Sequence, residues 1–295
     1  MNRGKDIFIF NIIAFIIVGI VGGAAIIPFV MLLVGSFQSE DSILQHGYSL
    51  IPRTFDLGAY KFIFDQPAKI IQSYGVTLFI TVAGTGLSLF FSSMAAYVLA
   101  RKDVKYRNPM AFYLFFTTLF SAGLVPYYML ITNYLFLRNT ISILLLSGMF
   151  NVLYILILRT YIANSIPDSI SESAKIDGAN DFSIFMKVIL PLLKPALASI
   201  GLFVALGYWN DWYTATLFIT EEKLFPLQYT LYKLLSSTTF AKQLLEGNGA
   251  VSAIELPQQT VKLALTVVAT GPIVLAYPFV QKYFVSGLTI GSVKG

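Results

Sequence analysis

The chain has 295 residues, of which 56% are hydrophobic and 12% are charged, and its mean hydropathy of +0.73 is too high for a surface that faces water. It contains no cysteine and one histidine, which excludes disulfides, thiol catalysis and Cys/His metal clusters. Its net charge of +5 is not gathered into a basic stripe, so no nucleic-acid partner is expected. Composition therefore predicts a protein of the lipid bilayer with no metal site and no catalytic residues.

Six stretches poor in charge are each long enough to cross a hydrocarbon core of about 30 Å, which needs about 20 helical residues. They lie between Asp6 and Glu40, Lys69 and Arg101, Arg107 and Arg138, Arg138 and Arg159, Pro195 and Thr220, and Lys262 and Lys282. Continuous apolar runs favour helices over the alternating pattern of a membrane barrel. We expect an all-α, polytopic membrane protein with six transmembrane helices that form a single domain over residues 1–295.

The distribution of Lys and Arg predicts the orientation of these spans. With the N-terminus inside, the cytoplasmic segments are 1–6, 101–108, 159–194 and 282–295. Lys and Arg outnumber Asp and Glu in these segments, whereas the rest of the chain is slightly acidic. The positive-inside rule therefore predicts a multi-pass protein of the inner or plasma membrane with both termini in the cytoplasm. The first apolar stretch is longer than the core of a signal peptide, so it is expected to stay as the first span.

The second expected span carries a face of small residues suited to close helix packing. Its members are Gly84, Gly86, Ser88, Ser92, Ser93, Ala95 and Ala96. Such faces are ordinary in membrane bundles, so this one is expected to be structural.

The connection at 166–195 is much longer than a link between neighbouring helices requires. Pro167 and Asp168 predict a helix start, and the spacing of Ile166, Ile170, Ala174 and Gly178 places them on one face. Gly178 is suited to a left-handed turn at the end of this helix. A second amphipathic helix is expected to follow, broken by prolines before the fifth span. Its markers are Phe182, Phe185, Ile189, Leu192 and Leu193, followed by breaks at Pro191 and Pro195.

Several residues of this connection form a pattern that resembles the EAA loop of binding-protein-dependent ATP-binding cassette (ABC) importers, in particular of carbohydrate permeases. They are Glu172, Ser173, Ala174, Asp177, Gly178 and Ala179, with Ile189, Leu190 and Pro191 after them. The sequence departs from the family pattern at Ser173, where alanine is usual, which is an exchange of one small residue for another. The resemblance extends over most of the chain and implies a type I importer permease fold.

In this family the loop is a coupling helix that docks into a groove of a separate ATPase, so the resemblance implies a cytoplasmic coupling loop at 164–195. Small Ala174 and Gly178 allow close approach, and Glu172 and Asp177 are placed to meet basic groups of that partner. A helix lying on lipid would instead favour a basic polar face. The chain has no GxxxxGK[ST] motif, so ATP and Mg are expected on the partner and no cofactor in this chain.

A polar and aromatic cluster lies in the outer half of the fifth span. Trp209, Asn210, Asp211 and Trp212 resemble the W-N-[DE] segment of sugar permeases, and Asp211 is the only charge of the span. On a continuous helix Trp209 shares a face with Trp212 and Tyr213. The cluster is thus a candidate for the substrate path. Two alternatives stay open: an interfacial aromatic belt, and a structural role for Asp211.

The terminal sequence VSGLTIGSVKG is similar to the tail of the second maltose-type permease, which reaches between two ATPase subunits. The resemblance implies tail contacts with the ATPase from Gly287, Gly291 and Lys294, in a cytoplasmic tail at 285–295. The alternative is a terminus without fixed structure.

The sequence thus predicts a transporter subunit rather than an enzyme: a permease of an ATP-driven oligosaccharide importer. The implied partners are a second homologous permease, two nucleotide-binding ATPase subunits, an extracytoplasmic sugar-binding protein, an oligosaccharide and the lipid bilayer. The alternative is a secondary transporter driven by an ion gradient, which would require intramembrane ionisable pairs, whereas Asp211 stands alone. An intramembrane enzyme or assembly factor is disfavoured because the spans hold no His, no Cys and no clear acid pair.

Overall fold

The computed structural model describes residues 3–65, 67–247 and 259–289, and all regular structure in these ranges is helical. The chain divides into two compact units. Unit 1 comprises Met1–Pro67 and Leu231–Pro272, and unit 2 comprises Ala68–Thr230 and Ile273–Gly295. The predicted all-α class is confirmed.

Unit 1 holds the first three helices and shares the last two helices of the chain with unit 2. These are α1 (Arg3–Gly35), α2 (Glu40–His46), α3 (Gly58–Ile63), α14 (Leu227–Gly247) and α15 (Gln259–Thr289). No residue in the most apolar stretch of α1 is buried. Glu40 accepts hydrogen bonds from the backbone N–H groups of Gln259 and Thr260, both at 2.8 Å, and so satisfies donors that the start of α15 would leave free.

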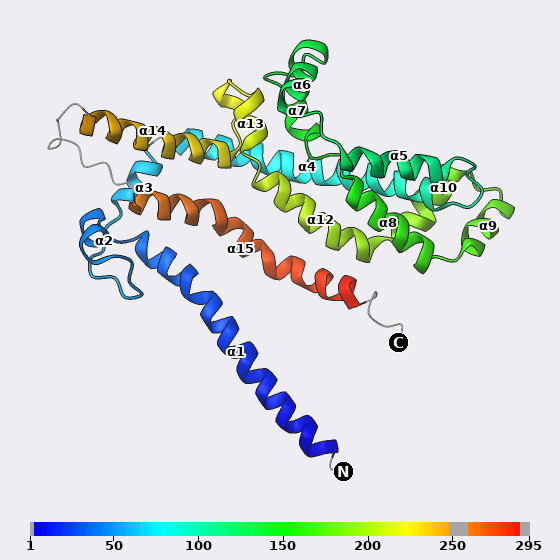
Figure 1. Cartoon of the computed structure of the whole chain (residues 1–295), viewed down its shortest axis with the longest axis horizontal. Coiled ribbons are helices and arrows are strands. Elements are labelled where there is room, and N and C mark those ends of the chain that lie inside the picture. The colour runs from blue at the N-terminus through cyan, green and yellow to red at the C-terminus, as the bar shows by residue number, and fades with distance from the viewer. Residues whose placement is uncertain (1–2, 66, 248–258, 290–295) are drawn as a thin grey trace. The chain divides into compact units, whose positions relative to one another are not determined.

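Unit 2 contains α4 and the helices that pack on it (Figure 1). They are α4 (Pro67–Ala100), α5 (Arg107–Leu119), α6 (Leu124–Met129), the π-helical turn η1 (Leu130–Tyr134), α7 (Ile141–Leu146), α8 (Val152–Ser165), α9 (Asp168–Ile176), α10 (Asp181–Ile184), the π-helical turn η2 (Phe185–Ile189), α11 (Leu190–Leu192), α12 (Lys194–Trp209), α13 (Tyr213–Phe218) and the 3-10 turn η3 (Glu222–Leu224).

Two buried clusters stabilise unit 2. One joins α4, α5, α8 and the segment from α10 to α12, and includes Tyr97, Leu158, Phe185 and Leu193. The other joins α4, η1, α7 and α13, and includes Ile143 and Phe218. The predicted small-residue face of α4 supplies buried positions at Gly84, Ser88, Ser92, Ser93 and Ala96, whereas Gly86 is exposed. This packing face is therefore confirmed at most of its positions.

Two described helices, Phe10–Gly35 within α1 and Pro67–Ala100, are long and apolar enough to cross a membrane. Two further candidates are bent pairs: Arg107–Leu119 with Leu124–Tyr134, at 114°, and Asp181–Leu192 with Lys194–Trp209, at 80°. Val152–Ser165 and Gln259–Leu275 are shorter apolar helices. The count of six spans therefore stays a prediction.

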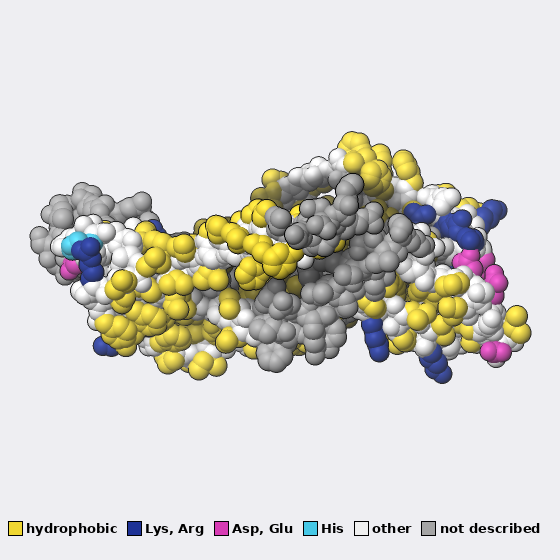
Figure 2. Space-filling model, turned by 90° about the horizontal axis from the view of Figure 1, so that it is seen from below, with side chains coloured by type: hydrophobic (Ala, Val, Ile, Leu, Met, Phe, Trp, Pro, Cys, Tyr) yellow, Lys and Arg dark blue, Asp and Glu magenta, His cyan; other side chains and the backbone are white. Residues whose placement is uncertain are grey.

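A group of charged side chains lies at the end of unit 2 that carries α9 and α10 in Figure 1, where Figure 2 shows Lys, Arg, Asp and Glu close together. Large hydrophobic side chains on α4 and α5 are exposed instead, for example Val82 and Phe112. A surface this apolar is suited to lipid or to a protein partner rather than to water.

Candidate functional site

The helix α9 begins and ends where the sequence predicts. Pro167 occupies its N-cap position, and Asp168 lies in the first turn near the positive end of the helix dipole. At the other end Gly178 has a φ of +83°. The N–H of Ala179 donates to the carbonyl of Ala174 and that of Gly178 to Lys175, both at 3.0 Å. This is a Schellman ending, which favours glycine at the left-handed position.

The second helical segment of the loop is anchored in the core. The Asn180 side chain accepts a hydrogen bond from the N–H of Ser183 at 2.8 Å and so caps α10. Phe185 is buried, and its ring stacks on that of Tyr97 at a centroid distance of 5.9 Å. The predicted break before the fifth span is present: the chain bends by 80° at Leu193, which lies between Pro191 and Pro195. Pro191 itself lies inside the helical turn α11, and Pro195 lies in the first turn of α12.

Four charged side chains tie α9 and α10 to the segment that follows α4. Arg101 pairs with Asp103 and with Asp181, the latter at 2.7 Å, and Lys175 pairs with Asp103 at 2.9 Å. The hydrogen bonds from Arg101 and from Lys175 hold the pKa of Asp103 well below its usual range. The hydrogen bond to Asp103 likewise raises the pKa of Lys175. Asp103 and Lys175 are therefore both charged near neutral pH.

Other side chains of α9 are left open to a partner. Ile176 is 86% exposed, although it is a large apolar residue. Glu172 and Asp177 are exposed, and neither forms an ion pair within the described residues. No residue of α9 is buried. An apolar side chain flanked by two unpaired carboxylates is typical of a surface that meets another protein.

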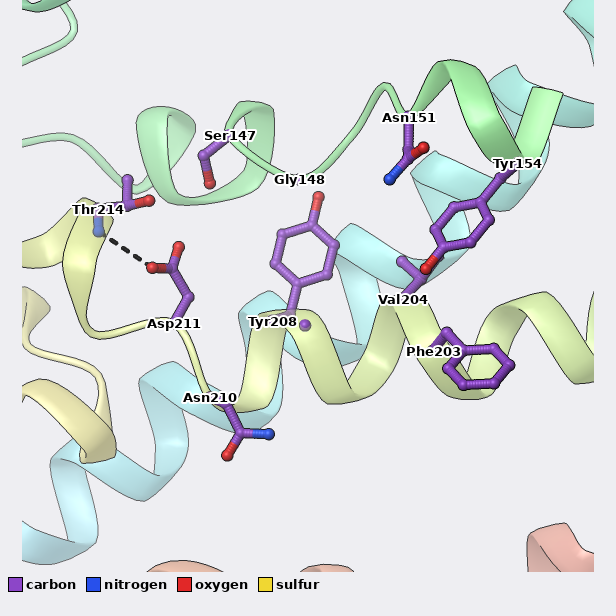
Figure 3. Close-up of a pocket in the computed structure, with 11 residues that line it drawn as sticks. Ser147, Gly148, Asn151, Tyr154, Phe203, Val204, Tyr208, Asn210, Asp211 and Thr214 are labelled. Atoms are coloured by element: carbon purple, nitrogen blue, oxygen red, sulfur yellow. Dashed lines mark hydrogen bonds between the residues drawn. The ribbon is translucent and has the colours of Figure 1, made fainter. Parts of the chain in front are cut away.

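A cavity of about 320 Å³ lies in unit 2 beside the end of α12 (Figure 3). Its lining from α12 and the residues after it consists of Phe203, Val204, Gly207, Tyr208, Asn210, Asp211 and Thr214. The lining from the region of α7 and α8 consists of Ser147, Gly148, Asn151 and Tyr154. The lining combines aromatic rings with hydroxyl, amide and carboxylate groups, and it holds no lysine or arginine. These groups are suited to a neutral ligand rich in hydroxyl groups.

Tyr208 forms one wall of the cavity and is fixed by close packing. Its hydroxyl donates to the carbonyl of Leu145 at 2.5 Å, and Figure 3 shows its ring directed toward Gly148. A Cβ added at Gly84 would approach the Tyr208 ring to 2.5 Å, and one added at Gly148 would approach it to 2.9 Å. The ring therefore fits only because both positions are glycine.

The predicted continuous helix through Asp211 is wrong. Helix α12 ends at Trp209, and α13 begins at Tyr213. The Asn210 amide donates to the carbonyl of Leu206 at 2.9 Å, and Asp211 Oδ1 accepts from the N–H of Thr214 at 3.0 Å, the bond drawn in Figure 3. These side chains thus satisfy backbone groups at the break between the two helices.

The four candidates for the substrate path consequently separate. Asn210 and Asp211 line the cavity. Trp209 is 7% exposed and contacts the ring of Tyr74 at a centroid distance of 6.4 Å, outside the lining. Trp212 is exposed and packs edge-on against Tyr213. Trp209 therefore does not share an aromatic face with Trp212 and Tyr213, contrary to the prediction.

The sequence interpretation missed the contribution of the segment between α7 and α8. Asn151 caps α8 by accepting a hydrogen bond from the N–H of Leu153 at 3.0 Å, and it lines the cavity together with Ser147 and Tyr154. A polar residue that caps an otherwise apolar helix was the available signal. The meeting of this segment with α12 is a long-range contact that a single sequence does not reveal.

The candidate tail residues lie mostly outside the described residues. Gly287 falls within α15, which continues to Thr289. Gly291 and Lys294 lie beyond it, where the structure describes nothing.

Comparison with known proteins agrees with this architecture. Residues 88–290 match the family described as "Binding-protein-dependent transport system inner membrane component". Protein LplC of Bacillus subtilis is 38% identical over 100% of this chain and 98% of its own length. The polygalacturonan/rhamnogalacturonan transport system permease protein YtcP of the same organism is 40% identical over 92% of this chain and 93% of its own. A chain from the crystal structure of a bacterial ABC transporter that imports alginate superposes with a TM-score of 0.77 at 32% identity, covering 96% of this chain and 99% of that one.

The chain therefore belongs to the family of binding-protein-dependent transport system inner membrane components. It is a multi-pass membrane permease subunit of an ABC importer and acts with other components of that transport system. It is a transporter subunit rather than an enzyme. This membership excludes the alternative of a secondary transporter driven by an ion gradient.

Proposed function

We propose that this chain is one of two paired permeases of an oligosaccharide importer and that its loop at 166–195 docks on a separate ATPase. The observation that carries the proposal is α9, which has no buried residue yet is fixed by a Schellman ending and by ion pairs. Only Ala174 of this helix packs against the core, and it is partly buried, so most of the surface of α9 is open to a partner. The exposed Ile176 supplies the apolar contact of that interface, and Glu172 and Asp177, which have no ion pair in the part of the chain that the structure describes, supply the acidic ones.

In this proposal the N-terminus, the loop and the C-terminus are cytoplasmic, as the Lys and Arg distribution predicts. Two ATPase subunits bind ATP and Mg, and an extracytoplasmic binding protein delivers the sugar. Closure of the ATPases on ATP moves α9, and the path between the two permeases then opens outward. The tail at 285–295 is an additional contact with the ATPases in the same scheme.

Two lines of support favour an oligosaccharide as the substrate. The cavity places Asp211, Asn151 and Ser147 near the rings of Tyr154 and Tyr208, an arrangement suited to a sugar, whose C–H faces stack on rings while its hydroxyls form hydrogen bonds. The relatives include permeases named for polygalacturonan or rhamnogalacturonan and for arabinooligosaccharides. We propose Asn210 and Asp211 as part of the path in this chain.

Docking is tested by Gly178→Glu in the assembled transporter. A Cβ added at Gly178 has no described atom within 4 Å, so a side chain can start there without a clash inside the chain, and a Glu would collide with a docked partner. We expect normal membrane insertion, loss of the co-purifying ATPase and loss of oligosaccharide uptake by cells.

Gly47→Glu is the matched control, because Gly47 also has a positive φ, of +74°, and open space around it but lies outside the loop. It is expected to keep the ATPase bound, because the backbone strain that it adds lies outside the loop. Normal ATPase binding and uptake in Gly178→Glu would refute the docking proposal. Unchanged uptake of every oligosaccharide in cells that lack this chain would refute the proposed substrate class.

A further inference from the structure

The charge ring formed by Arg101, Asp103, Lys175 and Asp181 joins the proposed coupling helix to a distant part of the chain. We propose that these residues are positioning residues that carry displacement of α9 directly to the cytoplasmic end of α4. The inference rests on the proposed coupling function of α9 and adds a route by which the movement reaches the cavity.

The geometry of the ring favours a firm connection over a loose surface pair. Arg101 contacts Asp103 through two guanidinium nitrogens, with Nε at 2.8 Å from Oδ1, and uses Nη1 for Asp181 at 2.7 Å. Lys175 Nζ closes the ring at 2.9 Å from Asp103 and 3.7 Å from Asp181. Opposite charges thus alternate around four members, and the planar fork of arginine fixes the orientation of both carboxylates.

The ring is anchored to the core through Arg101, whose side chain is only 16% exposed. Its guanidinium lies 5.6 Å from the centre of the Tyr97 ring, and Tyr97 stacks on buried Phe185. Arg159 of α8 also donates to the carbonyl of Leu99 at 3.2 Å and so satisfies a terminal acceptor of α4. The end of α4 therefore moves with its neighbours rather than fraying.

The charge ring links α9 to α4, two helices that the backbone does not join directly. The backbone links α9 to α8 on one side and to α10 on the other, whereas α4 ends more than sixty residues earlier. Lys102 and Asp168 form a second, more exposed link between the same two segments at 2.6 Å. From its cytoplasmic end α4 continues to Gly84, which packs on Tyr208 in the wall of the cavity. The ring thus connects the surface proposed to meet the ATPase with the helix that supports the cavity.

The test uses Asp103→Asn, Lys175→Met and the double variant in the complete transporter with its binding protein and an oligosaccharide. We expect each single variant to keep the ATPase bound while uptake per ATP hydrolysed falls several-fold. The double variant is expected to be no worse than either single one, because both remove the same connection. Lys187→Met is the matched control, since Lys187 is an exposed cation of the same loop with no ion pair within the described residues.

Two results would overturn the inference. If uptake and ATPase activity fall together, in proportion to the amount of assembled complex, the ring is merely structural. If uptake per ATP is unchanged in all three variants, the ring carries no movement. Gly178→Glu distinguishes failure of this inference from failure of the proposed function. If Gly178→Glu loses the ATPase while the ring variants keep normal uptake per ATP, only the role of the ring is refuted. If Gly178→Glu retains the ATPase, the docking proposal itself is refuted.

Discussion

The loop that carries α9 and the wall of the cavity are held in place by different forces. Helix α9 buries no side chain and is fixed by ion pairs and by the hydrogen bonds of its Schellman ending. Tyr208 is buried and is fixed by contact with two glycines. Charge and backbone conformation therefore contribute most to the position of α9, whereas volume decides the position of the cavity wall.

The two regions are therefore expected to tolerate different substitutions. Close-packed interiors respond to a single added methyl group, because neighbouring atoms have nowhere to move. Replacing one member of an exposed ion pair changes the free energy of unfolding only slightly, and salt screens the interaction. Exposed ion pairs are suited to a region that docks on a partner and moves with it. Close packing is suited to a wall that defines a cavity.

The largest effect on stability is expected from Gly84→Ala. The added methyl group would lie 2.5 Å from the Tyr208 ring, so the ring or α4 must shift. Overpacking of this kind costs about 1–3 kcal/mol. Thermal unfolding of the detergent-purified complex measures this loss, and transport should fall as the cavity wall moves.

Gly75→Ala supplies the control for this prediction on the same helix. No atom lies within 4 Å of the position that its Cβ would occupy. Alanine is favoured over glycine inside a helix by about 0.5–1 kcal/mol, so this variant should be neutral or slightly more stable. Equal stability of the two variants would show that the space between Gly84 and the Tyr208 ring does not limit the size of the side chain at position 84.

A smaller effect is expected at Asp211, where the structural and substrate-path roles are separable. Asp211→Ala removes the acceptor for the N–H of Thr214 and should cost about 0.5–2 kcal/mol, as for other helix caps. Asp211→Asn retains an acceptor oxygen and should keep the stability. Among the described residues that line the cavity, Asp211 carries the only carboxylate. Asp211→Asn should therefore also raise uptake of uronate-containing oligosaccharides relative to neutral ones.

Thermal unfolding measured beside uptake of one neutral and one acidic oligosaccharide distinguishes the two roles. A stable Asp211→Asn complex with an unchanged ranking of sugars would leave Asp211 a purely structural cap. A destabilised Asp211→Asn complex would contradict the geometry of the cap itself.

The parts of the structure that could be predicted are those determined by local chemistry. Pro167 and Asp168 start α9, and Gly178 takes the left-handed turn after it, because these residue types have strong backbone preferences at helix ends. The small-residue face of α4 was predictable for a similar reason, since its spacing follows the helical period. The same local motif also identified the loop as the candidate docking surface.

The parts that could not be predicted depend on competition between side chain and backbone or on distant contacts. Hydropathy favours one helix through residues 195–220, but Asn210 and Asp211 form hydrogen bonds with nearby backbone groups and end it. The third expected span is divided near Gly123, whose φ of +86° is likewise invisible to hydropathy. Asp181, the partner of Arg101 on α10, lies far along the chain, and no periodicity within one segment indicates this pair.

The smallest effect on stability is expected from Asp103→Asn, and its dependence on pH identifies its cause. The pKa of Asp103 is lowered in the folded protein by Arg101 and then by Lys175. A lowered pKa adds stability above the ordinary Asp value of about 3.9, and this stability is lost as pH falls through the lowered value. The raised pKa of Lys175 adds stability that is lost only at alkaline pH, so both contributions are present near pH 7.

Because Asp103 is half exposed, solvent screening limits the cost of Asp103→Asn near neutral pH to below about 1 kcal/mol. The free energies of unfolding of the wild-type and Asp103→Asn complexes should therefore differ slightly at about pH 7 and low salt. The difference should shrink in acid. It should also shrink at about 1 M salt, where the Debye length is about 3 Å. Asp177→Asn removes an exposed carboxylate of the same loop that has no ion pair within the described residues. Its effect on stability should therefore not depend on salt in this way. A difference for Asp103→Asn that persists unchanged in acid and in high salt would mean that packing rather than charge holds α9 to α4, and the contrast between the loop and the cavity wall would then fail.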